Sequence, residues 1–198
     1  MARTSQNEMK VLSFLTRHFT EKYSINQLAK HVDMTPKGAH KLLKRLEQEE
    51  IINPQKLGNA IFYALNFKSD LALKKAELSL FETLTLPYAR AQAKDLERLR
   101  PFAQTAILFG SVLEKGDKAK DIDVLFVLDK KNYKSFQNEL DKLQRIKPKK
   151  IHPVLQAPED IVNNLRKQDT VILEILRTGR ILWGHDIIVN AIKRAVEK

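Results

Sequence analysis

Two aspartates separated by one isoleucine, Asp121 and Asp123, form the most chemically specific pattern in the sequence. They stand where a polar loop enters the apolar run 124–128, which predicts a buried strand. Because side chains alternate along a strand, both carboxylates are expected on one face. Mg²⁺ held by one or two carboxylates and by phosphate oxygens is typical of phosphoryl and nucleotidyl transfer. We therefore predict a catalytic Mg²⁺ (or Mn²⁺) site at Asp121 and Asp123.

The alternative for this pair is an ordinary strand start behind a capped loop. Two carboxylates at the mouth of a buried strand would then repel each other and lose solvation without compensation. A bound cation is the simpler interpretation.

A Gly-Ser pair, Gly110 and Ser111, follows another apolar segment that predicts a strand, residues 105–109. Glycine lets a backbone come close to a phosphate, and the serine hydroxyl and amide can donate hydrogen bonds to it. Gly110 and Ser111 are therefore candidate nucleotide-binding residues.

This combination of Gly-Ser, a spacer and Asp-x-Asp on the next strand resembles the nucleotidyltransferase superfamily that includes DNA polymerase β, and specifically its minimal, stand-alone members. The resemblance covers residues 88–198, in which a helix (132–145), a strand (150–156) and a helix from Pro158 are expected to follow. The closing segment 174–184 also resembles the leucine, x, glycine turn of these members. The resemblance implies a mixed sheet flanked by helices and a nucleoside triphosphate as substrate.

The sequence departs from the family pattern beside the Gly-Ser pair. Glu114 stands where the family usually has an arginine, and Lys115 is the nearest cationic substitute, so Lys115 joins the nucleotide-binding candidates. Lys120 precedes the first aspartate, where serine is common, and could contact phosphate or only be solvated.

The third carboxylate of active members is the larger departure. It normally lies on the later strand, here residues 150–156, which contain no acid. His152 and Gln156 are the residues that could take its place, and His152 could act as a general base near neutral pH. We interpret His152 as a surface or packing histidine in preference to a base. Glu159 and Asp160 lie beyond the strand, where acids are favourable at a helix start.

The N-terminal part predicts three helices and a hairpin. Residues 7–19 have helical periodicity, Asn26 is a possible N-cap of a second, short helix, and Thr35 caps a third that begins at Pro36. The segment 51–65 predicts a β-hairpin with a turn at Gly58-Asn59. Residues 7–66 resemble a winged helix domain of transcription regulators.

The third helix would be the recognition helix of such a domain. Its polar face carries basic side chains that could contact the major groove and flanking phosphates of double-stranded DNA, while the alternative is an ordinary solvated helix face. The predicted DNA-binding residues are Lys37, His40, Lys41, Lys44 and Arg45.

Residues 69–86 have apolar residues at helical spacing before Pro87, which predicts a further helix. Such a helix could pack against a second copy, which predicts a homodimer, or against the neighbouring domain.

The composition excludes several classes of protein. In 198 residues, 43% hydrophobic residues suffice for a core, and no apolar run is long enough to span a bilayer, so no membrane association is expected. Without cysteine, disulfides, thiolate zinc sites and cysteine nucleophiles are excluded. The N-terminal residues lack the apolar core of a secretory signal, which favours a cytoplasmic protein. The net charge of +11 indicates a polyanionic partner, although it could serve solubility alone.

We thus predict an α/β (α+β) protein with a winged helix domain at 1–68, a connecting or dimerisation helix at 69–87 and a nucleotidyltransferase-like domain at 88–198. Three functions fit. The first is a DNA-binding enzyme that transfers a nucleoside monophosphate to an unidentified acceptor, such as a partner protein. The second is a transcriptional regulator whose inactive transferase-fold domain binds only a nucleotide or a partner protein. The third is a winged helix that docks protein or RNA beside an active transferase. The missing acid favours the second, and the intact Gly-Ser and Asp-x-Asp patterns favour the first, which we place first.

Overall fold

The computed structural model describes residues 5–197, and its chain divides into two compact units, residues 1–80 and 81–198. The boundary falls inside the segment 69–87 that was expected to connect two domains. The outermost residues of the predicted domains, 1–4 and 198, lie outside the described residues. Helices and two sheets occur together, so the predicted mixed α/β class is confirmed.

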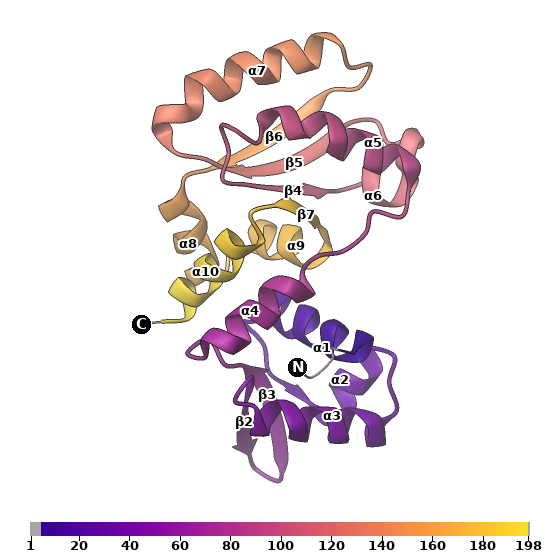
Figure 1. The fold of residues 1–198 in the computed structure, drawn as a ribbon, viewed down its shortest axis with the longest axis vertical. Helices are drawn as coiled ribbons and strands as arrows, with labels where there is room; N and C mark the ends of the chain where they lie inside the picture. Colours follow the sequence, from indigo (N-terminus) through magenta and orange to yellow (C-terminus); the bar gives the residue numbers. More distant parts are fainter. Residues whose placement is uncertain (1–4, 198) are drawn as a thin grey trace. The chain divides into compact units, whose positions relative to one another are not determined.

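Unit 1 combines helices with a small antiparallel sheet in the order β1-β3-β2. Strands β2 and β3 form a hairpin whose turn contains Gly58 at φ +59°, as the Gly-Asn pair predicts. The apolar stripes of the helices supply fully buried leucines, among them Leu12, Leu28 and Leu43. The elements of unit 1 (Figure 1) are α1 (Gln6–Arg17), β1 (Tyr23–Ser24), α2 (Ile25–His31), α3 (Pro36–Gln48), β2 (Ile52–Leu57), β3 (Ala60–Leu65) and α4 (Asp70–Ser79).

Of the two predicted helix caps in unit 1, one is confirmed and one is wrong. Helix α3 begins at Pro36, and the Thr35 side chain accepts from the Gly38 amide at 3.2 Å, which confirms the predicted start. The predicted cap of α2 at Asn26 is wrong. Ser24 caps this helix instead, because its hydroxyl and the Gln27 side chain each accept from the other residue's backbone amide, a capping box.

The helix predicted over 69–86 is shorter than expected. Helix α4 ends at Ser79, and no helix covers residues 81–86. This stretch contains two threonines, whose branched side chains favour helices weakly, and it ends before Pro87, which disfavours helical geometry in the residue it follows. Pro87 instead begins the next helix.

Unit 2 is built on a four-stranded mixed sheet in the order β6-β5-β4-β7. Strand β4 pairs antiparallel with β5 and β7, whereas β6 runs parallel to β5. Its strands are β4 (Thr105–Phe109), β5 (Ile122–Val127), β6 (Ile151–Gln156) and β7 (Arg180–Trp183).

Helices cover both faces of this sheet (Figure 1). Helices α5 and α7 pack on one face, where Phe126 of β5 meets Phe136 of α7 with ring centroids 4.8 Å apart. Helices α8, α9 and α10 cover the other face. The predicted mixed sheet flanked by helices is therefore present. The helices are α5 (Pro87–Leu96), α6 (Val112–Lys115), α7 (Tyr133–Arg145), α8 (Pro158–Arg166), α9 (Thr170–Thr178) and α10 (His185–Val196), with 3-10 turns η1 (Glu97–Leu99), η2 (Gly116–Lys118) and η3 (Lys130–Asn132).

Strand β5 lies between β6 and β4, and its apolar side chains are buried. Ile122 and Val124 are almost fully buried, whereas the side chain of Asp123 between them is about a quarter exposed. In the part of the chain that the structure describes, no helix is long and apolar enough to cross a lipid bilayer.

Candidate active site

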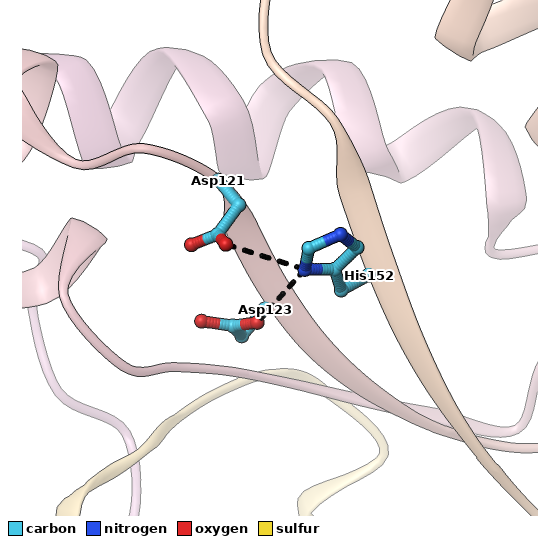
Figure 2. A group of neighbouring side chains, drawn as sticks. All are labelled: Asp121, Asp123 and His152. Atoms are coloured by element: carbon cyan, nitrogen blue, oxygen red, sulfur yellow. Dashed lines mark ion pairs between the residues drawn. The ribbon is translucent and has the colours of Figure 1, made fainter.

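Three polar side chains meet where β5 and β6 begin (Figure 2). Asp121 directly precedes β5, Asp123 is its second residue, and His152 lies opposite Asp123 on the neighbouring strand. One ligand atom from each of these side chains lies within 4.8 Å of the others. Two of the three were predicted as a pair, and the structure adds His152.

His152 faces both carboxylates with the same ring nitrogen. Its Nδ1 is 3.3 Å from Oδ2 of Asp121 and 3.6 Å from Oδ1 of Asp123. The parallel pairing of β5 and β6 produces this approach because it brings His152 into register with Asp123. His152 was one of the two residues offered for the place of the third acid, although a surface or packing role was preferred for it. The signal available in the sequence was the expected position of a third acid on this strand.

The two carboxylates of the cluster repel each other. Burial raises the pKa of Asp123 above its ordinary value, and the Asp121 carboxylate raises this pKa further, while His152 acts in the opposite direction. A divalent cation would relieve the repulsion between the carboxylates. Two carboxylates and an imidazole that converge on one point are a donor set that fits such an ion, with Asp121, Asp123 and His152 as its holders.

The Gly-Ser turn lies directly beside Asp123. Gly110 adopts φ +74°, and a Cβ at this position would come within 2.6 Å of Oδ2 of Asp123. Only glycine leaves both the backbone conformation and the carboxylate undisturbed here. The turn can therefore bring a phosphate next to the carboxylates.

A cavity of about 700 Å³ opens beside this turn. The three predicted nucleotide-binding residues, Gly110, Ser111 and Lys115, all contribute to its wall, together with residues of α9 and β7. Its volume is in the range of small-molecule and cofactor sites. The sequence did not indicate that α9 contributes. The lining residues are Phe109, Gly110, Ser111, Leu113, Glu114, Lys115, Thr170, Val171, Glu174, Ile175, Thr178 and Arg180.

The predicted DNA-binding residues lie on α3 of unit 1. Lys37, His40, Lys41 and Lys44 are exposed to solvent. Arg45 is placed differently, because its guanidinium pairs at 2.5 Å with the buried carboxylate of Glu8. The structure therefore groups four of the five on an open face and directs Arg45 to an internal ion pair.

The Gly-Ser turn, the paired aspartates and the mixed sheet together define a domain that resembles the nucleotidyltransferases. The comparison with known families agrees, since residues 94–188 match the family model described as "Polymerase beta, Nucleotidyltransferase". This match runs from the end of α5 to the start of α10 within unit 2 and supports the nucleotidyltransferase assignment of that part of the chain. No curated protein and no solved structure matches the chain.

Proposed function

We propose that this protein is a metal-dependent nucleotidyltransferase that transfers a nucleoside monophosphate from a nucleoside triphosphate to an acceptor hydroxyl. The observation that carries this proposal is the proximity of Asp121 and Asp123 to each other, together with the Gly110 turn, which lies against Asp123 and also lines the cavity. The family match over residues 94–188 supports the reaction class.

The residues of unit 2 have distinct parts in this reaction. The cavity holds the nucleoside, and Gly110, Ser111 and Lys115 bind the phosphates. Asp121 and Asp123 would hold Mg²⁺ or Mn²⁺, and such an ion would supply positive charge against the phosphates. The acceptor oxygen attacks the α-phosphorus, the bond from this phosphorus to the β-phosphate oxygen breaks, pyrophosphate leaves, and the hydroxyl proton passes to water.

Transfer is tested with α-labelled nucleoside triphosphates, the divalent metal, and the full chain together with whatever nucleic acid or protein co-purifies with it. Label is expected in the acceptor, and Asp121→Ala is expected to abolish the incorporation because the metal loses a ligand. Asp186→Asn removes an exposed carboxylate of α10 outside the cluster and is the matched control. Failure of the native protein both to bind a triphosphate with metal and to transfer label would contradict the proposal.

A second candidate follows from one observation, the histidine that replaces the acid on β6. In this alternative the domain binds a nucleotide without turnover and regulates unit 1. Metal-dependent triphosphate binding without transfer to any acceptor in the same assay would favour it over the enzyme.

We further propose that unit 1 is a winged helix that binds double-stranded DNA in a cytoplasmic setting, with α3 as recognition helix and the β2-β3 hairpin as the wing. Support comes from the element order of unit 1 and from the exposed Lys37, His40, Lys41 and Lys44. A homodimer belongs to this proposal, since α4 leaves Leu71 and Leu78 exposed. Light scattering on the full chain checks the dimer.

DNA binding is tested by fluorescence anisotropy with a labelled duplex over a range of salt concentrations. Lys41→Glu with Lys44→Glu is expected to reduce affinity by at least about tenfold and to lower the salt slope by about 2, since each phosphate contact releases counterions. Lys131→Glu with Lys134→Glu changes the net charge equally on exposed residues of unit 2 and is the control. Equal losses in both double variants would contradict a role for α3.

A further inference from the structure

The third group of the aspartate cluster is an imidazole on an edge strand. Strand β6 ends the sheet order β6-β5-β4-β7, and the His152 side chain is 44% exposed there. Figure 2 shows one ring nitrogen turned toward both aspartates. One ring nitrogen and one carboxylate oxygen from each aspartate are thus brought together at the start of β5 and β6.

We propose that His152 is a direct metal ligand and that, because of it, this site binds a first-row transition-metal ion in preference to Mg²⁺. The inference rests on the proposed function, since it concerns the cation that Asp121 and Asp123 hold. It adds direct coordination by the His152 Nδ1 atom and the class of metal that this ligand selects.

The distances favour ligation over a simple hydrogen bond. The Nδ1 atom lies 3.3 and 3.6 Å from the two carboxylate oxygens. A charge-assisted hydrogen bond between such groups would be about 2.7 to 2.9 Å long. Ligand atoms that share one cation at roughly 2.0 to 2.2 Å lie roughly 3.0 to 3.6 Å apart in octahedral or tetrahedral geometry. The two distances from Nδ1 fall in this range, and all three ligand atoms lie within 4.8 Å of one another.

The chemistry of the ligands sets the choice of metal. Mg²⁺ prefers oxygen ligands and exchanges its water reluctantly, whereas imidazole nitrogen binds transition metals well. A third carboxylate, as the family pattern has, would keep the donor set entirely oxygen. Replacing it with His152 lowers the affinity for Mg²⁺ relative to ions from Mn²⁺ to Zn²⁺.

The affinity test is calorimetric titration of the chelator-treated full chain with Mn²⁺ alone and with Mg²⁺ alone. Native protein is expected to bind Mn²⁺ at least about tenfold more tightly than Mg²⁺. His152→Asp, which restores an oxygen ligand, is expected to reduce this ratio, and Asp186→Asn should leave it unchanged. His152→Gln serves as a second variant, with circular dichroism to confirm that each protein is folded.

The ligation test is pulsed electron paramagnetic resonance of bound Mn²⁺. The native protein should show modulation from a directly coordinated ¹⁴N nucleus, and the signal should vanish in His152→Asp while Mn²⁺ remains bound. Bound Mn²⁺ without nitrogen modulation, or an unchanged Mn²⁺ to Mg²⁺ ratio in His152→Asp, overturns the inference and leaves the proposed function intact. If no divalent ion binds in a way that depends on Asp121 and Asp123, the inference and the proposed function fail together.

Discussion

Folding disfavours ionisation of the Asp123 carboxyl group. Its side chain is only 27% exposed, and the Asp121 carboxylate is its neighbour. Burial first, and Asp121 second, raise the pKa of Asp123. A group whose pKa is raised on folding destabilises the metal-free protein above its unfolded pKa, where the unfolded chain carries the charge freely.

Asp123→Asn is therefore expected to stabilise the metal-free protein at neutral pH while it abolishes metal binding. The melting temperature should rise by about 2 °C, as stability changes below 1 kcal/mol produce in a chain of this length. The gain should disappear at acidic pH below the unfolded pKa, since the carboxyl is then protonated in both states. Thermal scans with a chelator at neutral and acidic pH measure both effects. A lower melting temperature at neutral pH would contradict this account.

Sequence alone could place Asp121 and Asp123 on one face, because strand alternation is a local property. The family pattern offered His152 and Gln156 for the place of the third acid, but it could not choose between them, because that depends on the parallel register of β6 with β5, which the chain between the strands does not specify. The same limit applies to α9, whose residues line the cavity beside Gly110.

At the scale of elements, one lysine ties together the two segments that carry the cluster. Lys149 precedes β6, and its Nζ donates to the backbone carbonyl oxygens of Asp117 and, at 2.6 Å, of Ala119 in the loop that leads to β5. The same Nζ lies 4.6 Å from the centroid of the Tyr88 ring, a cation–π contact. These contacts fix the approach of Asp121 to β6.

Lys149→Met is expected to weaken Mn²⁺ binding by roughly 3- to 10-fold, the effect of losing one or two hydrogen bonds that position a ligand. The Mn²⁺ to Mg²⁺ ratio should remain unchanged, because the three ligands are intact. Lys150→Met is the matched control, since Lys150 is the exposed next residue. Calorimetric titration measures both quantities. Equal affinity in the native protein and in Lys149→Met would show that the Lys149 contacts do not position the metal ligands.

Element ends were harder to predict than the elements. The start of α3 was right because Thr35 and Pro36 act locally, whereas Ser24 in place of Asn26 caps α2 through a reciprocal bond with Gln27. Helix α4 ends at Ser79 although the apolar spacing continues to residue 84, so the spacing predicted a longer helix than the structure has. The winged helix and its DNA contacts remain predictions.

At the scale of the whole molecule, the chain joins two units that each enclose a core. In unit 1, Glu8 is 1% exposed and pairs with Arg45 at 2.5 Å and with Lys75 at 2.8 Å, which connects α1 with α3 and α4. In unit 2, the only tryptophan of the sequence, Trp183, is buried and donates from Nε1 to the carbonyl oxygen of Ala103 at 2.9 Å. Tryptophan fluorescence therefore reports on unit 2, while circular dichroism reports on both units.

Glu8→Ala is expected to lower the free energy of unfolding of unit 1 by about 1 to 3 kcal/mol, because two cations lose a buried partner but retain access to solvent. The circular dichroism transition should gain an early component, while the fluorescence transition of Trp183 stays at its native temperature. Glu77→Ala, which removes the partner of the exposed Lys74, should change neither signal by more than a few tenths of a kcal/mol. Phe136→Ala should instead destabilise unit 2, since it leaves a cavity in that core. The fluorescence transition should then fall to a lower temperature. If Glu8→Ala shifts the fluorescence and circular dichroism transitions by the same amount, the two cores unfold as one cooperative system.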